Sequence, residues 1–442
     1  MTEIIGKTID TEGLRALGRL YGSELAVVEF DDCKDADDIG VIDLCKGSPN
    51  LKKLSLRYRC ENLSLRGRVG FTDAVVLAVT TYCPDIEVLS LNGWSLVTDA
   101  AMSYLGNLSS LKEVCLCLCP NLTSTGVQNL IKANNNNLEV LILSEIVDQY
   151  LCPAEPFIDA ALLTCIGNHC PRLIKLHVTI PEEGSDVTDE SLTAMLAGCP
   201  LLEELTLGEF NKPNNTMHAL AAHCNHLKRL MLVTVELTAA GVALVCEHCP
   251  ELQSLKLMQC TRLIDGDNAV FAIAAHCPKL QEFALTCSTV HDESLCALFK
   301  ACADLRAVRL ELNIWVTGQS TATLLEYCPK LQYLRFEVFE CTDINSLGIA
   351  TYGKALEHLE VIGELQATDD PVGLISKGCP RLKTFILHSY YDVTERTVRA
   401  VLVNCPHLVE LRVRARSKLS DEFEALCDGI GKRYRAPRLL WK

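Results

Sequence analysis

The chain has 442 residues, of which 49% are hydrophobic and 22% charged, and its formal net charge is -15 at pH 7. So much apolar material excludes a disordered chain, and the negative charge disfavours DNA and RNA because phosphate binding depends on Lys and Arg. No apolar run approaches the ~18 residues that a helix needs to cross a bilayer, so no membrane segment is expected.

The N-terminal segment reads MTEIIGKTIDTEGL, in which Glu3, Lys7 and Asp10 interrupt any apolar stretch. It shows no secretory signal, which predicts a cytoplasmic protein, with a nuclear location as the alternative. In a reducing compartment the 24 cysteines are expected to be small buried groups rather than disulfides. Residues 1–30 are predicted to form the first unit or cap, because the segment from Ile9 to Phe30 reads as a helix followed by a strand.

From residue 25 onward the pattern LxxLxL recurs fifteen times, mostly at intervals of 25 to 26 residues. These intervals fall within the ~20–29 residues of leucine-rich repeats. Each unit is predicted to hold a short strand with period-2 apolar residues and a helix with helical apolar spacing, as in AGVALVCEHC. The first positions of the predicted strands are Leu25, Leu51, Ile86, Leu111, Leu138, Leu173, Leu202, Leu227, Leu252, Leu280, Leu305, Leu331, Leu356, Leu382 and Leu408.

The predicted helices have marked ends. A Cys-Pro pair such as Cys249-Pro250 stops a helix, because proline has no N–H to donate and pushes the residue before it out of the α region. We expect the Cys to stack beneath the same residue of the next unit, with its weak S–H facing a helix-end carbonyl. The phrases FTDA, VTDA, VTDE and VTER, and VHDE in one unit, place Thr or Asp where they can cap a helix start. The last helical turns hold His169, His223, His248 and His276, where an imidazole can meet unpaired carbonyls.

The Cys-Pro pairs recur in register along almost the whole chain. Together with the VTDxxL starts and the LxxLxL strands, they resemble the cysteine-containing leucine-rich repeats of F-box/LRR proteins and AMN1-like proteins. This resemblance implies substrate recognition for a ubiquitin ligase. No F-box is seen, because the unit from Ile9 to Phe30 leaves no room for one at the N-terminus, which makes AMN1-like proteins the nearer comparison. The pairs begin at Cys83, Cys170, Cys199, Cys249, Cys277, Cys328, Cys379 and Cys405.

The two layers of such a repeat require different spacings. Parallel strands lie ~4.8 Å apart, whereas packed helices need ~8–10 Å, so stacked units must curve with their strands on the inside. The sequence therefore predicts an α/β leucine-rich-repeat solenoid, a horseshoe with parallel strands on the concave face and helices on the convex face. It is expected to be a single solenoid of about fifteen repeats over residues 1–442.

Three insertions interrupt the regular spacing, at residues 57–70, 144–157 and 180–186. They follow strands and therefore rim one edge of the solenoid, where long loops are frequent binding elements. The alternatives are surface insertions without a role, or loops that cover the concave face. Tyr150 and Phe157 are the candidate contact residues in the second insertion.

Strand alternation sends positions two, four and six after the first leucine onto the concave face. In the C-terminal half, this places Tyr333 and Arg residues beside Met231 and Met258, which are expected to be exposed, a composition typical of protein interfaces. This stretch is the main predicted partner site, and the loop edge is the alternative. Its residues are Arg229, Met231, Lys256, Met258, Arg309, Glu311, Tyr333, Arg335, Glu337 and His358, flanked by Glu360, His388, Arg412 and Arg414.

The strands between Ile86 and Leu138 instead place apolar groups on the same face, which must be covered by a loop or form a hydrophobic docking patch. Two clusters of Cys and His residues are better explained by repeat packing than by a metal site, because neither has a recognised ligand spacing. No GxxxxGK[ST], HExxH or GxSxG motif is present, so neither an enzyme nor a cofactor is expected. The apolar groups on this face are Val88, Cys115, Cys117, Val140 and Ile142. The first cluster consists of Cys115, Cys117 and Cys119, and the second of His218, His223, Cys224 and His226.

The C-terminal segment, residues 417–442, is predicted to add a capping helix from Asp421 to Ile430 and a basic tail, KRYRAPRLLWK. Terminal repeats need such shielding.

Three functions compete. The first is a protein-interaction scaffold that binds a partner protein on the concave face and edge loops, with ubiquitin-ligase components among the candidate partners. The second is a receptor for a small polyphosphate, for which Arg309, Arg335, Arg412 and Arg414 are the candidate ligands. The third is an architectural subunit of a large assembly that binds through the convex or lateral surfaces.

Overall fold

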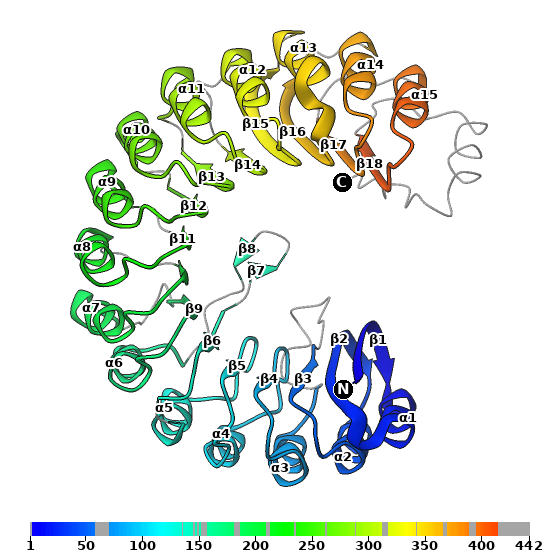
Figure 1. Cartoon of the computed structure of the whole chain (residues 1–442), viewed down its shortest axis with the longest axis vertical. Coiled ribbons are helices and arrows are strands. Elements are labelled where there is room, and N and C mark those ends of the chain that lie inside the picture. The colour runs from blue at the N-terminus through cyan, green and yellow to red at the C-terminus, as the bar shows by residue number, and fades with distance from the viewer. Residues whose placement is uncertain are drawn as a thin grey trace. The chain divides into compact units, whose positions relative to one another are not determined.

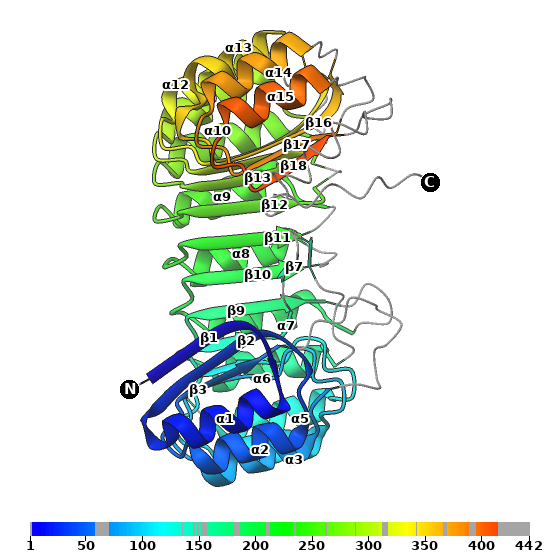
Figure 2. The same cartoon turned by 90° about the vertical axis from the view of Figure 1, so that its right-hand side faces the viewer.

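The structure is a computed structural model of the chain. It describes residues 2–57, 70–134, 136–144, 146–147, 150–151, 157–180, 186–208, 213–233, 236–260, 263–287, 289–311, 317–341, 343–365, 369–388 and 395–413. The chain divides into two compact units, unit 1 from Met1 to Leu227 and unit 2 from Lys228 to Lys442. In each unit, parallel strands form one layer and helices the other (Figure 1, Figure 2).

Strands and helices alternate along unit 1, and its sheet order is β1-β2-β3-β4-β5-β6-β9-β10. The strands are β1 (Thr2–Asp10), β2 (Leu25–Asp35), β3 (Lys53–Leu56), β4 (Val88–Ser90), β5 (Glu113–Cys115), β6 (Val140–Ile142), β9 (Lys175–Thr179) and β10 (Glu204–Gly208). The helices are α1 (Thr11–Tyr21), α2 (Asp38–Gly47), α3 (Asp73–Tyr82), α4 (Asp99–Leu105), α5 (Ser124–Ala133), α6 (Ala160–His169), α7 (Asp189–Gly198) and α8 (Pro213–His223), with a 3-10 turn at Gly22–Glu24.

The same alternation continues in unit 2, where β11 to β18 follow one another in sequence order across the sheet. The strands are β11 (Arg229–Val233), β12 (Ser254–Met258), β13 (Glu282–Thr286), β14 (Ala307–Glu311), β15 (Tyr333–Cys341), β16 (His358–Leu365), β17 (Thr384–His388) and β18 (Glu410–Val413). The helices are α9 (Ala239–His248), α10 (Gly266–His276), α11 (Asp292–Ala301), α12 (Gly318–Tyr327), α13 (Asp343–Tyr352), α14 (Asp369–Gly378) and α15 (Glu395–Asn404), with a 3-10 turn at Gly353–Ala355.

The core of each repeat lies between the two layers. In the repeat that contains β12, Leu252, Leu255 and Leu257 are at most 1% exposed. Leu255 pairs in parallel register with Leu230 on β11 and with Phe283 on β13, so equivalent residues of successive repeats stack. Polar side chains alternate with these residues and lie on the sheet face away from the helices, which we call the open face.

The helix starts confirm the predicted caps. Thr72, Thr98 and Thr188 each accept a hydrogen bond from a backbone N–H in the first turn of their helix. His291, in the phrase VHDE, occupies an N-cap position without such a side-chain bond. The phrase VTER, from residue 393, begins just outside the described residues.

The helix ends confirm the predicted role of cysteine. Cys302 caps α11, and its Sγ lies 3.4 Å from the carbonyl oxygen of Cys277, which caps the preceding helix. Cys328 repeats the contact at 3.5 Å from the carbonyl oxygen of Cys302. Every cysteine whose side chain the structure describes is a buried free thiol, and burial raises the pKa of Cys302 and of Cys328 to about 12. At His248, ring Nδ1 lies 2.9 Å from the carbonyl oxygen of Leu244, as expected for the last helical turn.

All fifteen predicted strands are present, and two features were not predicted. β1 adds a parallel strand before the first predicted one, where it pairs with β2 over residues Thr2 to Asp10. Ile146–Val147 and Tyr150–Leu151 form a small antiparallel pair, β7 and β8, inside the second insertion. The other two insertions fall almost entirely outside the described residues, and the predicted cap from Asp421 to Ile430 and the basic tail fall wholly outside them. The single solenoid over residues 1–442 stays a prediction.

Candidate functional site

The open face of unit 2 gathers most of the predicted partner-binding residues. Because its strands are parallel and in register, the middle outward position of each strand aligns into one row across the sheet. Neighbours in this row lie one strand spacing apart, about 4.8 Å. The central row consists of Met231, Lys256, Ala284, Arg309, Arg335, Glu360, Ile386 and Arg412.

Four charged residues in the middle of this face form one ionic cluster: Arg309, Glu311, Arg335 and Glu360. Glu311 Oε1 lies 2.7 Å from Arg309 Nη2 and 3.0 Å from Arg335 Nη2. Arg335 Nη1 in turn donates to Glu360 Oε2 at 2.9 Å. A single carboxylate thus bridges two guanidinium groups, and the second guanidinium reaches a second carboxylate.

The position of Glu311 has an electrostatic reason. Arg309 and Arg335 face each other directly across β14 and β15, and like charges in that position repel. Glu311 lies two residues after Arg309 on β14 and therefore on the same face, where it contacts both groups. The four side chains are only 10–14% exposed, so solvent screens their interactions less than it screens surface ion pairs. The cluster carries no net charge.

On the β11–β13 side of the cluster, Lys256 Nζ contacts Glu282 Oε2 at 3.0 Å. Burial alone would raise the pKa of Glu282, but the Lys256 ammonium and a hydrogen bond from Ser254 outweigh it and lower that pKa. The expectation that Met231 and Met258 are exposed is wrong, since each is 7% exposed. For Met258, the hydroxyl of Thr286 on the neighbouring strand lies 3.9 Å from the sulfur atom.

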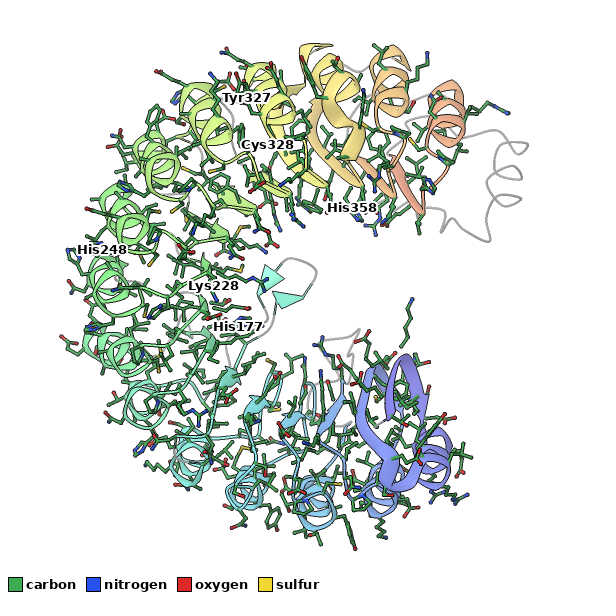
Figure 3. All side chains as sticks on the ribbon, in the orientation of Figure 1. His177, Lys228, His248, Tyr327, Cys328 and His358 are labelled. Carbon is green, nitrogen blue, oxygen red and sulfur yellow. The ribbon has the colours of Figure 1, made fainter. Side chains whose placement is uncertain are left out.

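On the β15–β18 side, Tyr333 and His358 are direct cross-strand neighbours, and their ring centroids are 6.1 Å apart. His358 points from the strand layer toward the open side in Figure 3. Burial is the largest cause of the lowered pKa of His358, so the ring is mainly neutral at pH 7. Farther along the sheet, Arg412 Nε donates to Glu410 Oε1 at 2.6 Å.

The remaining predicted site residues fall in different surroundings. Arg229 is exposed at the start of β11 and Glu337 is half-buried on β15. Phe157 is 3% exposed and packs in the interior of unit 1 rather than on its surface. The backbone of Tyr150 lies in β8, but its side chain is outside the described residues, as is Arg414. The role of all these residues in partner binding stays a prediction.

Sequence reasoning placed Arg309, Glu311 and Arg335 on this face but did not predict which charged groups pair with one another. Glu282 and Glu360 each complete an ion pair; Glu360 was predicted only to flank the site, and Glu282 was not predicted at all. The signal was present, because both occupy outward strand positions next to a basic residue of the neighbouring repeat. Comparing outward positions between successive repeats, instead of along one strand, would have found them.

The open face of unit 1 carries a smaller polar group. Glu204 Oε1 lies 2.9 Å from His177 Nε2 and 2.8 Å from Lys175 Nζ. Burial alone would raise the pKa of Glu204, but hydrogen bonds from His177 and Lys175 outweigh it and bring that pKa to about 2. Farther along this sheet, Val88 and Val140 are half-buried.

The cysteines of the two predicted clusters are buried within the repeats. The sulfur atoms of Cys115 and Cys117 are 3.5 Å apart, and both side chains are buried. Cys224 is fully buried at a helix end, like the other repeat cysteines. In the described part of the chain, no group of three His, Cys, Asp or Glu side chains could hold a metal ion.

Among the helices that the structure describes, every one is too short or too polar to cross a bilayer.

Comparisons with known proteins give the context of this fold. No protein-family model matches the chain. The F-box/LRR-repeat protein 4 of Bos taurus is 24% identical over 263 residues, 55% of this chain and 41% of that protein. The F-box protein SKIP1 of Arabidopsis thaliana is 23% identical over 186 residues, 42% of this chain and 47% of that protein. The chain therefore spans less than half the length of these curated relatives.

Among solved structures, a chain in the crystal structure of the yeast Rad7 and Elc1 complex superimposes with a TM-score of 0.56. The two chains are 18% identical, and the match covers 75% of this chain and 79% of the other. The predicted resemblance to F-box/LRR proteins is thus confirmed over about half the chain, and the nearer likeness to AMN1-like proteins stays a prediction. The protein has the leucine-rich-repeat fold, and its sequence is similar to the F-box/LRR-repeat proteins.

Proposed function

We propose that this protein is a non-enzymatic interaction scaffold that binds a partner protein on the open face of unit 2, as a substrate-recognition factor related to F-box/LRR proteins. The observation that carries the proposal is the ionic cluster of Arg309, Glu311, Arg335 and Glu360, flanked by the Tyr333–His358 pair. Tyr and Arg are enriched at the centres of protein interfaces. An ordered cluster with fixed side chains also loses little conformational entropy when a partner binds.

The charge balance of this face favours a protein over a polyanion. A polyphosphate site needs uncompensated basic groups, because its affinity comes from neutralising phosphate charge. Here Arg309, Arg335 and Arg412 each lie within 3 Å of a carboxylate oxygen. A surface that alternates basic and acidic groups instead fits a protein surface of mixed charge. The polyphosphate receptor is therefore the weaker alternative.

The similarities to known proteins also support the proposal of a protein-binding scaffold. Both relatives carry the F-box name, and the solved neighbour comes from a complex of two proteins. The resemblance to F-box/LRR proteins implies ubiquitin-ligase components as partners. This chain would then supply the surface that selects what the ligase modifies.

The test is affinity purification of the full chain and two variants, with quantitative mass spectrometry. The first variant, Tyr333→Ala with Arg229→Glu, changes the open face and keeps all four residues of the ionic cluster. The control, Glu247→Lys, places a comparable charge change on the exposed side of α9. We expect the same set of proteins with the wild type and the control, and loss of that set with the first variant. Equal recovery by all three would refute binding at this face.

The composition of the recovered set tests the finer part of the proposal. Recovery of a cullin or its adaptor supports the ligase role, whereas a set without ligase components contradicts it and leaves only the scaffold. Thermal unfolding with saturating inositol hexakisphosphate tests the receptor alternative. We expect no change in Tm, and a saturable increase would favour the receptor.

A further inference from the structure

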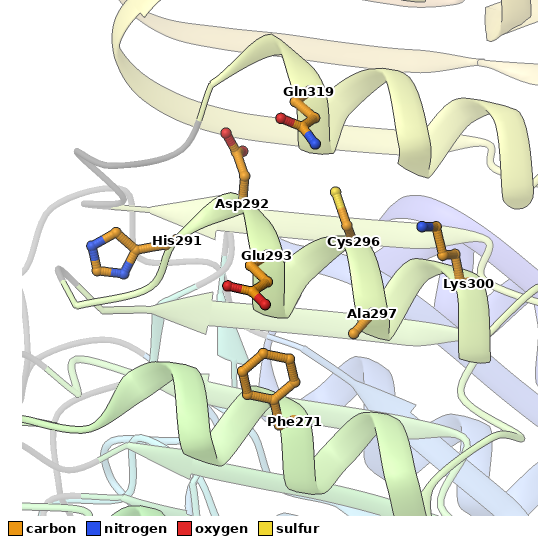
Figure 4. A pocket seen from close by; sticks show the side chains of 8 residues that line it. All are labelled: Phe271, His291, Asp292, Glu293, Cys296, Ala297, Lys300 and Gln319. Carbon is orange, nitrogen blue, oxygen red and sulfur yellow. The ribbon is translucent and has the colours of Figure 1, made fainter.

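A second surface lies on the helical layer of unit 2, on the side opposite the open face. A groove of about 650 Å³ runs along α11 between its two neighbouring helices (Figure 4). Phe271 of α10 and Gln319 of α12 border it, and α11 supplies the rest of its lining. Phe271 is 38% exposed, so part of its apolar side chain is available to a neighbouring molecule.

Two opposite charges mark the ends of this groove on α11. Glu293 lies in the first turn and Lys300 in the last, and both side chains are exposed. Seven residues separate them, two turns of helix, so they lie on the same side of α11 about 10.5 Å apart along its axis. Among the residues that the structure describes, neither forms an ion pair. The Lys300 ammonium lies 5.8 Å from the centre of the ring of Tyr327, the last residue of α12.

The middle of the groove is small and apolar. Ala297 lies close to the midpoint between Glu293 and Lys300, and Phe271 lies beside it on α10 (Figure 4). A small residue at this point lets another helix approach closely, and the exposed ring offers apolar contact next to it. The surface thus has a small apolar centre, with the carboxylates of Asp292 and Glu293 at one end and the Lys300 ammonium at the other. An apolar centre with a charged rim is the usual anatomy of a protein contact.

This arrangement is complementary to itself. When a second α11 lies antiparallel across the first, with a two-fold axis near Ala297, Glu293 of each copy faces Lys300 of the other. A two-fold interface requires this reciprocity, since a contact from one residue to another must also occur in reverse. We propose that the groove along α11 is the contact surface of a homodimer of this chain, held by two reciprocal Glu293–Lys300 ion pairs around Ala297 and Phe271.

The size of the groove sets the expected strength. Stable interfaces bury about 1,600 Å² in total, and one antiparallel helix pair with a flanking ring buries less. Ion pairs at a solvated rim contribute roughly 0–1 kcal/mol each and weaken with added salt. The dimer is therefore weak, with a dissociation constant in the micromolar range or above, and its stability depends on ionic strength.

The test is analytical ultracentrifugation of the full chain over a wide concentration range, with Glu293→Lys and Lys300→Glu as variants. Each variant puts like charges in both contacts, and we expect the dissociation constant of the dimer to rise at least about tenfold. An equimolar mixture of the two variants restores opposite charges in both contacts and therefore restores dimers. Glu247→Lys on α9 is the matched control and dimerises like the wild type.

Circular dichroism and thermal unfolding of each variant show whether α11 remains folded, and the mixture itself makes the test independent of small losses in stability. The proposal is overturned if the wild type stays monomeric at the highest attainable concentration, or if the mixture associates no better than either variant alone. It is also overturned if both variants dimerise as tightly as the wild type, which would place the contact elsewhere. None of these outcomes involves the open face, so they leave the proposed partner site untouched.

Discussion

Asp73 and Thr98 join two successive helices of unit 1. Asp73, the first residue of α3, accepts hydrogen bonds from the backbone N–H of Thr98 at 2.8 Å and from its hydroxyl at 2.6 Å. Thr98 in turn caps α4 through its side-chain oxygen. The N-cap of one helix is thus held by the helix before it, which couples the start of each helix to the stacking of repeats. The same bond recurs in three other places, where the backbone N–H groups of Thr72, Thr123 and Thr317 donate to Asp38, Asp99 and Asp292 respectively.

Replacing Asp73 by Ala should lower the free energy of unfolding by about 1–2 kcal/mol, because hydrogen bonds to a charged acceptor are worth ~1.5–3 kcal/mol and this site is partly solvated. Urea unfolding followed by circular dichroism measures the change. Asp85→Ala, at an exposed position outside any described helix or strand, is the control and should change little. Adding Thr98→Val to Asp73→Ala should cost less than the sum of the two single changes, since both remove the bond between the Thr98 hydroxyl and the Asp73 carboxylate. Additive losses would contradict the coupling between the two helices.

The cysteines at the helix ends should be chemically inert in the folded protein. A pKa of about 12 for the Cys302 thiol leaves about one molecule in ten thousand as thiolate at pH 8, and the side chain is fully buried. Iodoacetamide should therefore label Cys302 and Cys328 only after denaturation. Mass spectrometry of peptides from native and denatured samples makes the comparison. Rapid labelling of either residue in the native protein, at a rate close to that of a free thiol, is the contrary result.

These two features show why much of the fold could be predicted from the sequence. A cap or a Cys-Pro stop is weak evidence alone, but its repetition in register along the chain reinforced the assignment of the repeats. β1 was missed for the same reason. Its sequence, TEIIGKTID, has no LxxLxL pattern and no earlier repeat to be compared with.

The candidate site could be predicted only in outline. Strand alternation placed Arg309 and Arg335 on the open face, but their contacts depend on side-chain conformations across three strands. Met258 was expected to be exposed because only its own strand was considered. Its burial results from neighbouring strands, including Thr286, whose hydroxyl lies 3.9 Å from the sulfur.

The Glu204 carboxylate of unit 1 should make the free energy of unfolding depend on pH in the acidic range. The pKa of Glu204 in the folded protein is about 2, below its ordinary value of 4.5, so its stabilising contribution is complete above pH 4.5. That contribution is lost as the pH falls from 4.5 toward about 2, because the unfolded chain then binds the proton more readily. Glu204→Gln should lower stability at pH 7 and flatten the change in stability across this window. Unfolding by urea at a series of pH values checks both effects.

Glu113→Gln is the matched control for this experiment, since Glu113 lies on the same open face and forms no ion pair among the described residues. It should leave the pH dependence unchanged. If Glu204→Gln and Glu113→Gln give the same pH profile, His177 and Lys175 do not stabilise the Glu204 carboxylate.

The last prediction concerns the carboxylate at the centre of the ionic cluster. Glu311→Gln leaves Arg309 and Arg335 facing each other across the sheet without the anion between them. Removing one member of a buried ion pair costs ~3–5 kcal/mol, but Arg335 keeps its contact with Glu360 and the side chains retain some exposure. We therefore expect a loss of about 2 kcal/mol in the free energy of unfolding. Glu360→Gln should cost less, because Arg335 keeps Glu311, and Asp304→Asn in the exposed pair with Lys330 should cost almost nothing.

The same change tests the charge argument against a polyphosphate ligand. Glu311→Gln gives the cluster a net positive charge, so the variant should bind inositol hexakisphosphate measurably more tightly than the wild type does, in a salt-dependent way. Isothermal titration calorimetry at two ionic strengths measures this difference. A wild type that already binds the polyphosphate as well as the variant does would mean that Glu311 does not neutralise the two arginines, and the protein-binding role of this face would lose its main support.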